Sequence, residues 1–187
     1  MTFPLDHWRD PRATIATRYQ KSDIDYITHG GLVAMEVVRG LQIPPDRAGR
    51  MTLLDFGCGT GRISRILAGY FGKVIAYDPV QECIEVGKKE CSVPIPNIEY
   101  CTQLPDVKFD AVVAINVFEH LEHKEQIVAM ESILGVINPK APIMLWYNVM
   151  HNRDVLSAYF GVDFIKEDDA QIAKNGSYFI NVRIFAR

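Results

Sequence analysis

An aspartate and three alternating glycines stand close together in residues 53–64, which read LLDFGCGTGRIS. An apolar run precedes them, as is typical of a strand that leads into a turn. Glycine lowers the stability of a folded segment, so this spacing indicates that something approaches the backbone closely. In a doubly wound sheet, ligands lie beyond the carboxyl ends of the strands, where this stretch would fall. The residues therefore predict a ligand-binding loop.

The spacing of the glycines disfavours two common nucleotide sites. The pattern from Gly57 to Gly61 is G-x-G-x-G, whereas the dinucleotide fingerprint G-x-G-x-x-G would need a glycine where Arg62 stands. A phosphate-binding P-loop is also disfavoured, because no G-K-[ST] follows. The loop therefore favours a ligand without a pyrophosphate group.

Two carboxylates narrow the choice of ligand further. Asp78 follows the next expected strand, in VIAYDPV, where its side chain could accept hydrogen bonds from both hydroxyls of a ribose. Asp55 precedes the glycines and could bind a cationic amino group, directly or through water. A ligand with a ribose, a cationic end and no pyrophosphate is required, and S-adenosylmethionine fits this description.

The apolar patterns that must position these residues alternate between strand and helix. Strands are expected at 51–56, 73–77, 98–101, 109–115 and 142–147, with helices at 62–70, 80–89 and 122–137. This rhythm predicts a parallel sheet with helices on both faces. A short helix at 154–159 and strands at 162–166 and 178–185 follow, and these two strands suit an antiparallel hairpin. The expected fold is a doubly wound, mostly parallel α/β sheet of seven strands that ends in this hairpin.

A chain of 187 residues suits one domain with a small cap. Residues 1–49 are expected to form a helical lid over the substrate, and residues 50–187 the Rossmann-like core. Residues 22–39 have helical periodicity, in one piece or in two pieces broken at Gly30–Gly31, with Gly40 as the stop. Residues 43–46 are expected to form a loop.

Three motifs together resemble the class I S-adenosylmethionine-dependent methyltransferases. They are LLDFGCGTGRIS, VIAYDPV and FDAVVAINVFEHL, in this order, and the resemblance covers roughly residues 50–150. Within the family, this chain is most similar to the small-molecule, ubiquinone-pathway-like branch. The resemblance implies that Asp78 holds the ribose and that Pro79 lies beside the adenine. It implies further cofactor-binding roles for Asp55, Gly57, Cys58, Gly59 and Gly61 around the methionine and ribose, Thr102 and Gln103 around the adenine, and Ile115 and Asn116 under the methionine end.

One position departs from the family pattern. Many relatives carry an aspartate after the third strand that faces the adenine amino group, but this region here reads EYCTQLPD. Gln103 or a backbone carbonyl is left to make that contact.

Catalytic candidates follow the fourth and fifth expected strands. Glu119, His120 and His123 cluster in VFEHLEHKE, while Asn148 and His151 follow the fifth strand. In-line methyl transfer needs alignment above all, and a general base only where the acceptor must lose a proton. His120 could be that base, since histidine titrates near pH 6.5. Glu119 and His151 are its expected partners, unless the Glu-His pair caps the next helix or packs against the sheet.

A metal site is a further possibility at the same segment. The ubiquinone-pathway O-methyltransferases and the small-RNA 2′-O-methyltransferases carry a Glu-x-x-Glu-His pattern that binds a divalent ion. Asn116 replaces the first glutamate here, so the sequence predicts no metal.

Composition limits the partners and the location. The net charge of −3 argues against a nucleic-acid backbone as the main partner. None of the four cysteines forms a C-x-x-C pair, no run of about 18 apolar residues suggests a membrane span, and the first residues are too charged for a signal peptide. We expect a cytoplasmic enzyme that methylates a small molecule. The alternatives are a non-catalytic domain that binds the cofactor or its product, S-adenosylhomocysteine, and a methyltransferase for RNA or protein.

Overall fold

The computed structural model describes residues 23–90, 94–148, 167–172 and 178–185. The chain divides into two compact units, Met1–Pro105 and Asp106–Arg187. Each unit is described by itself below. No helix in the described ranges combines the length and the hydropathy that crossing a bilayer requires.

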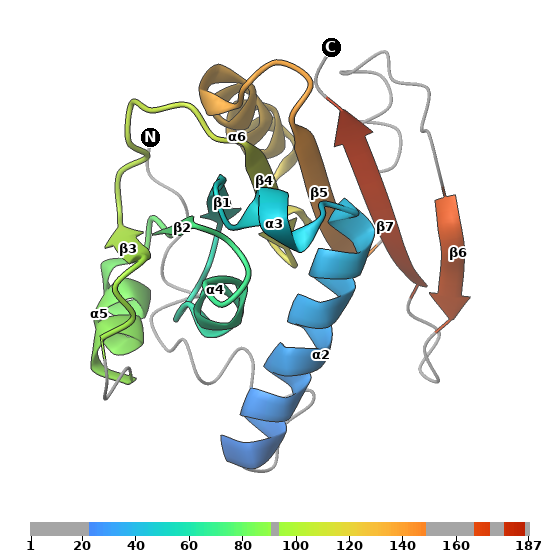
Figure 1. The fold of residues 1–187 in the computed structure, drawn as a ribbon. Coiled ribbons are helices and arrows are strands. Elements are labelled where there is room, and N and C mark those ends of the chain that lie inside the picture. Colours follow the sequence, from blue (N-terminus) through green and yellow to red (C-terminus); the bar gives the residue numbers. More distant parts are fainter. Residues whose placement is uncertain (1–22, 91–93, 149–166, 173–177, 186–187) are drawn as a thin grey trace. The chain divides into compact units, whose positions relative to one another are not determined.

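The first unit contains three parallel strands in the order β3-β2-β1 (Figure 1). The middle residues of β1 and β2 are buried on both faces, which explains the continuous apolar runs of these strands. The register aligns Leu54 of β1 with Ile75 of β2, and Ile75 with Glu99 of β3. The elements of this unit are α2 (Asp23–Leu41), α3 (Pro45–Ala48), β1 (Thr52–Phe56), α4 (Arg62–Leu67), β2 (Lys73–Tyr77), α5 (Gln81–Glu90) and β3 (Ile98–Cys101).

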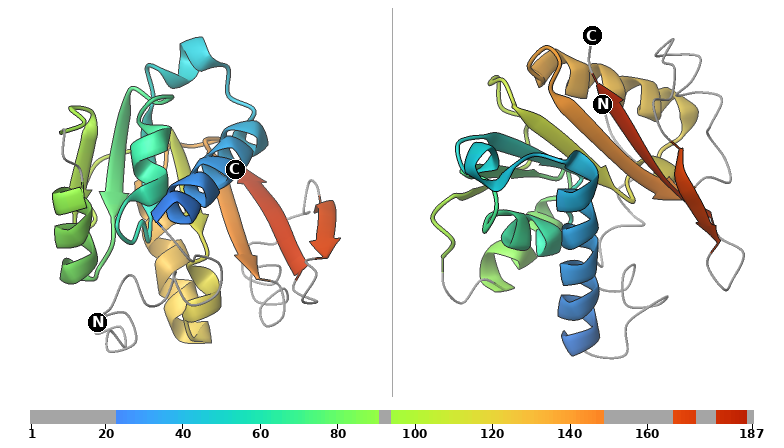
Figure 2. Two further views of the ribbon diagram at one scale, coloured as in Figure 1. Left: turned by 90° about the horizontal axis from the view of Figure 1, so that it is seen from below. Right: turned by 45° about the vertical axis from the view of Figure 1, so that its right-hand side comes forward.

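Helix α2 is continuous through Gly30 and Gly31, so this segment forms one helical piece and not two, and it ends at Leu41, one residue past the expected stop at Gly40. The helix packs against α4, as both views in Figure 2 show. It buries an apolar stripe at helical spacing, formed by Val33, Ala34, Val37 and Leu41. This tertiary packing outweighs the low helix propensity of the two glycines.

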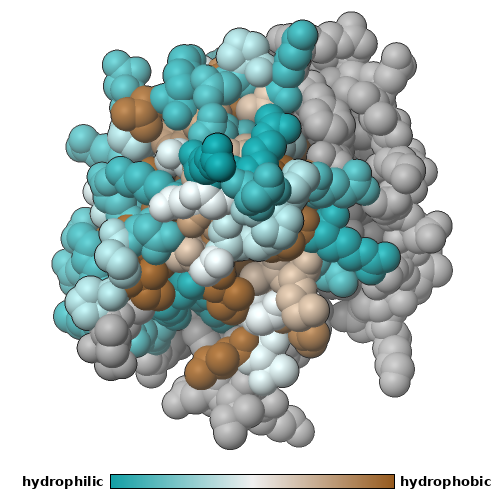
Figure 3. Space-filling view, viewed as in Figure 1, coloured by the Kyte–Doolittle hydropathy of each residue, from teal (hydrophilic) through white to brown (hydrophobic). Residues whose placement is uncertain are grey.

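Three further apolar side chains of α2 are exposed. Ile27, Leu32 and Met35 are 65%, 59% and 67% exposed. Hydrophobic side chains are visible on this face of the molecule, where α2 and α4 lie (Figure 3). Residues 45–48, partly expected in a loop, form the short helix α3 because Pro45 suits the first helical turn.

The second unit orders its strands β4-β5-β7-β6. β4 and β5 are parallel, whereas β7 is antiparallel to both β5 and β6. Every residue of β4 is buried, in agreement with its unbroken apolar sequence. The elements are β4 (Ala111–Ile115), the 3₁₀ turn η2 (Phe118–His120), α6 (His123–Val136), β5 (Pro142–Asn148), β6 (Glu167–Ile172) and β7 (Tyr178–Phe185).

The expected α/β class with a parallel sheet is confirmed, and β7 has the predicted bounds. The strand expected at 162–166 and the helix expected at 154–159 lie outside the described residues. The neighbour of β7 is instead β6 at 167–172, whose sequence EDDAQI carries no apolar alternation that could have marked it.

Candidate active site

The glycine loop joins β1 to α4 through a turn that only glycine adopts easily. Gly57, Gly59 and Gly61 have φ angles of 74°, 57° and 71°, all in the left-handed region. The N–H groups of Gly57 and Cys58 both donate to the carbonyl of Tyr77, at 2.8 and 2.9 Å. The loop is therefore fixed against the end of β2.

Asp78 follows β2 and also holds the loop. Its Oδ2 accepts the N–H of Gly59 at 2.8 Å, and its Oδ1 accepts the N–H of Val80 at 2.9 Å. The side chain is buried, which raises the pKa of Asp78, while the two hydrogen bonds lower it. Each carboxylate oxygen keeps a second lone pair with which it could accept a ligand hydroxyl.

Asp55 lies at the end of β1 and is 2% exposed. Its Oδ2 accepts the hydroxyl of Ser64 at 2.6 Å. Burial raises the pKa of Asp55 to about 6; the Ser64 hydrogen bond opposes this rise, and the charge of Asp78 adds to it. A nearby cation stabilises the ionised form of a buried carboxylate. This fits the predicted role of Asp55, which is to bind a cationic amino group.

The three glycines of the loop do not share one purpose. A Cβ atom placed on Gly59 would have no neighbour within 4 Å, so this side of the loop is open. A Cβ atom on Gly61 would overlap the ring of Tyr100 from β3, with the Tyr100 hydroxyl only 2.5 Å away. Gly59 thus leaves room for a ligand, whereas Gly61 leaves room for a protein side chain.

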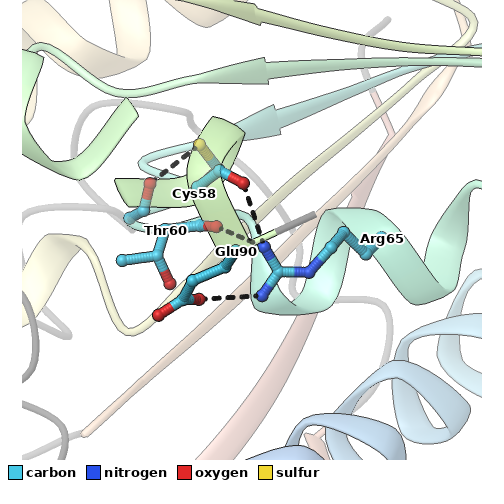
Figure 4. Close-up of polar contacts among 6 residues, drawn as sticks. Cys58, Thr60, Arg65 and Glu90 are labelled. Carbon is cyan, nitrogen blue, oxygen red and sulfur yellow. Dashed lines mark hydrogen bonds and ion pairs between the residues drawn. The ribbon is translucent and has the colours of Figure 1, made fainter. Parts of the chain in front are cut away.

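Arg65 of α4 ties the loop to α5 (Figure 4). Its guanidinium donates to the carbonyls of Thr60 at 3.0 Å and Gly87 at 3.4 Å, and forms an ion pair with Glu90 at 3.3 Å. Gly87 permits the approach, because a Cβ there would lie 2.6 Å from the Thr60 carbonyl oxygen. The loop is therefore held from both β2 and α5.

The residues expected around the adenine lie near Asp78. The N–H of Asp78 donates to the carbonyl of Cys101 at 3.1 Å, which brings the ends of β2 and β3 together. Pro79 and Thr102 are half-buried there, and Gln103 is exposed. These four residues follow β2 and β3 at one edge of the first unit, and their contact with an adenosine stays a prediction.

Cys58 lies within the loop, but its thiol is not activated. Burial raises the pKa of Cys58 well above its usual value, and the charges of Asp55 and Asp78 raise it further. The pKa of Cys83 is raised to about 12, chiefly by burial. Because the thiolate is the reactive form, both cysteines should be poor nucleophiles.

The second unit carries the remaining predicted residues at the end of β4. Ile115 is buried and Asn116 is exposed. Asn116 has a φ of 55°, and its N–H donates to the carbonyl of Trp146 at 2.6 Å. Asparagine tolerates this left-handed conformation better than the glutamate that some relatives carry here.

Glu119 and His120 belong to the turn η2. Oε1 of Glu119 lies 3.6 Å from Nε2 of His120, and the side chains are 22% and 35% exposed. They do not cap the following helix, because Glu122 is the N-cap of α6 and its N–H donates to Glu125 at 2.9 Å. The pair therefore has no part in capping α6.

Glu119 and His123 are four residues apart but do not lie on one helix, so their side chains do not share a helical face that could bind a metal. His123 begins α6, and the extended backbone of Leu121 separates it from η2. Within the described ranges, no three His, Cys, Asp or Glu side chains are grouped so that they could hold a metal ion. His151 lies outside the described residues.

Residues 54–145 match the family described as "Methyltransferase domain". This chain belongs to the class I methyltransferases. The match begins in β1 and ends in β5, so it spans the glycine loop, Asp78 and the η2 turn.

Several relatives of this methyltransferase are named for the same activity. The chain is 26% identical to the mitochondrial ubiquinone biosynthesis O-methyltransferase of Saccharomyces cerevisiae over 157 residues, which cover 80% of this chain and 49% of the relative. It is 30% identical to the ubiquinone biosynthesis O-methyltransferase of Bradyrhizobium diazoefficiens over 122 residues, covering 61% and 47%. The chain thus spans about half the length of these curated relatives.

The fold has solved counterparts. The crystal structure of magnesium protoporphyrin IX methyltransferase from Synechocystis with bound S-adenosylmethionine superposes with a TM-score of 0.68 at 14% identity, covering 98% of this chain and 91% of that one. At this identity the likeness establishes the fold of the methyltransferase.

Sequence reasoning missed four side chains that build the site. Ser64 ends the motif LLDFGCGTGRIS, and its hydroxyl bonds Asp55. Tyr100, Arg65 and Gln126 contact their partners only through the tertiary fold. Of these four, only Ser64 had a signal in the sequence. It is a small hydroxyl residue at the end of the glycine motif, which suits a buried hydrogen bond to Asp55.

Proposed function

We propose that this methyltransferase transfers the methyl group of S-adenosylmethionine to a small-molecule acceptor by in-line displacement. The open space at Gly59, whose N–H is bonded to the buried carboxylate of Asp78, supports this proposal most directly, together with the buried carboxylate of Asp55 at the end of β1. A positively charged amino group suits Asp55, and a pair of ribose hydroxyls suits Asp78. A dinucleotide would need a pyrophosphate site that the G-x-G-x-G loop does not supply.

The remaining cofactor contacts belong to the same proposal. Pro79, Thr102 and Gln103 would enclose the adenine, and Ile115 and Asn116 would lie under the methionine end. The bound sulfonium supplies an activated methyl group, so the chain has to align the acceptor and exclude water.

Where the methyl acceptor is a hydroxyl group, we assign to His120 the role of the general base that removes the hydroxyl proton. Its Nδ1 would accept the proton, while Nε2, which lies 3.6 Å from Oε1 of Glu119, would carry its N–H toward that carboxylate, so that Glu119 stabilises the imidazolium that forms. His151 is a second candidate for this role. No metal is part of the proposal, so removal of divalent ions with a chelator should leave turnover unchanged.

The names of the relatives support a small acceptor methylated on oxygen. The matched enzymes are named for ubiquinone biosynthesis, and the fold counterpart for magnesium protoporphyrin IX. Residues 1–49 would cap this acceptor and residues 50–187 would form the core, with the two groups of strands joined in one seven-stranded sheet. The exposed apolar side chains of α2 suit such a cap. A cytoplasmic location also stays a prediction, which cell fractionation can check.

Binding of S-adenosylmethionine, S-adenosylhomocysteine and NAD should be compared by calorimetry, and an acceptor screen with radiolabelled methyl groups should follow. Micromolar binding of both sulfur ligands without binding of NAD, followed by transfer to a small phenol, is the expected result. Binding without transfer to any small acceptor, RNA or protein would favour a regulatory domain. Tight, salt-sensitive binding to RNA would favour an RNA methyltransferase.

A further inference from the structure

Gln126 is a buried amide in the second turn of α6, and it is 1% exposed. Its Nε2 donates to the carbonyl of Phe118 at 2.9 Å and to the carbonyl of Leu121 at 3.0 Å. Phe118 opens the η2 turn, and Leu121 is the residue directly after it. One side chain therefore bridges both ends of the turn that carries Glu119 and His120.

The amide is not the best choice for stability alone. Among the described residues, Oε1 of Gln126 has no hydrogen-bond partner, and a buried polar atom left unpaired lowers stability. An apolar side chain of similar size would avoid this cost. The carbonyl of Phe118 would keep a second donor in any case, because the N–H of Leu121 lies 3.2 Å from it.

Gln126 is also not needed to start α6. The helix begins at His123 after the N-cap Glu122, whose N–H is bonded to the Glu125 side chain. The backbone N–H of Gln126 donates to the Glu122 carbonyl at 2.9 Å, a bond that any residue except proline would make. What the amide side chain adds is the fixed distance between the two ends of η2.

We propose that Gln126 is a positioning residue, which holds the Glu119–His120 turn in the geometry that methyl transfer requires. It acts through the backbone of η2 and does not touch substrate or cofactor. This proposal rests on the proposed function for the roles of Glu119 and His120. The geometry of the turn can also be measured without turnover.

The test replaces Gln126 with methionine, which has a similar volume and no N–H group. Ser132→Ala is the matched control, since it removes another side-chain bond to the α6 backbone, Ser132 Oγ to the Val128 carbonyl at 2.7 Å, away from η2. Three quantities are compared with the parent enzyme: the affinity for S-adenosylmethionine by calorimetry, kcat and KM with the acceptor found, and the imidazole signal of His120 by NMR.

For Gln126→Met we expect cofactor affinity within about twofold of the parent, a kcat at least about tenfold lower, and a shifted or broadened His120 signal, because the turn loses its bridge. Ser132→Ala should change none of these. A folded Gln126→Met enzyme with the parent's kcat or His120 signal would overturn the proposal. If Gln126→Met does not fold, Gln126→Leu serves the same comparison. If the parent binds cofactor but methylates nothing, the proposed function fails, and the His120 signal alone decides whether Gln126 fixes the turn.

Discussion

The backbone N–H of Gly59 donates to Oδ2 of Asp78 over 2.8 Å, although 19 positions separate the two residues. The glycine that leaves open space for a ligand is thus bonded to the carboxylate proposed to bind the ribose. If the proposed role of Asp78 holds, one side chain determines both the loop geometry and the recognition of the ribose.

Asp78→Ala should weaken S-adenosylmethionine binding by about 1–3 kcal/mol, because the ribose hydroxyls and the Gly59 N–H all lose an acceptor. Calorimetry measures the affinity, and thermal unfolding should show a lower Tm for the same reason. Asp110→Ala is a control, since it removes an acceptor from Asn138 in the second unit. Equal affinities for the parent and the Asp78 variant would place the ribose elsewhere.

Asp55 should make the stability of the empty protein depend on pH. Its folded pKa is about 6, above the ordinary value of 3.8, so between these values the folded state binds a proton that the unfolded chain has released. Stability should therefore fall by roughly 1–3 kcal/mol as pH rises from about 4 to about 6, and then level off. Denaturation in urea at several pH values measures this, and Asp55→Asn should remove most of the slope.

Cofactor affinity should respond to the same group in the opposite direction. Only the ionised carboxylate attracts a cationic amino group, so affinity should rise as pH passes through about 6. Asp55→Asn should bind weakly at every pH. An affinity that is flat between pH 5 and pH 7 in the parent would contradict the assignment of Asp55, and calorimetry in buffers of equal ionic strength would show it.

Gly59→Ala and Gly61→Ala should fail in different ways. Both place a Cβ at positive φ, which costs roughly 1–2 kcal/mol. Gly61→Ala adds an overlap with Tyr100, so it should lower the Tm further, and Tyr100→Ala in the same chain should recover part of the loss. Gly59→Ala should keep more stability and lose at least about tenfold in cofactor affinity, as its methyl group would occupy the ligand's space.

Two adjacent glycines of α2 offer another paired comparison. A Cβ on Gly31 would meet nothing within 4 Å, so Gly31→Ala should stabilise the helix by about 0.5–1 kcal/mol. A Cβ on Gly30 would lie 2.7 Å from Cγ of Arg62, whose guanidinium reaches Nδ1 of His29 at 3.2 Å. Gly30→Ala should therefore destabilise, by about 1 kcal/mol, as overpacking does. Urea unfolding that gives both variants the same sign would contradict the contact.

The sequence was sufficient where local pattern and tertiary environment agree. The bounds of β2, β3 and β7 were predicted correctly, because apolar runs end at Gly, Pro, Asp or polar residues. The loop from Gly57 to Gly61 and the carboxylates beside it were also predicted, since their spacing carries the chemistry.

The predictions were incomplete where residues far apart in the sequence determine the local structure. Nothing near Gly30 in the sequence indicates that the Arg62 side chain will lie across it, so the pattern left one helical piece and two pieces both open. β6 is a polar segment whose strand conformation depends on pairing with β7. The pattern around Glu119 also does not reveal the 3₁₀ turn there, or that the amide of Gln126 will bond the Phe118 carbonyl of that turn.

The contact between Gly61 and Tyr100 bears on how such motifs evolve. The second glycine of the G-x-G-x-G signature faces open space, whereas the third makes room for the ring of Tyr100 from β3. In a relative with a smaller side chain at position 100, a Cβ at position 61 would no longer overlap a ring. Only the positive φ would then restrict position 61, and asparagine tolerates a positive φ. In an alignment of relatives, the third glycine should therefore vary together with position 100 and independently of the cofactor.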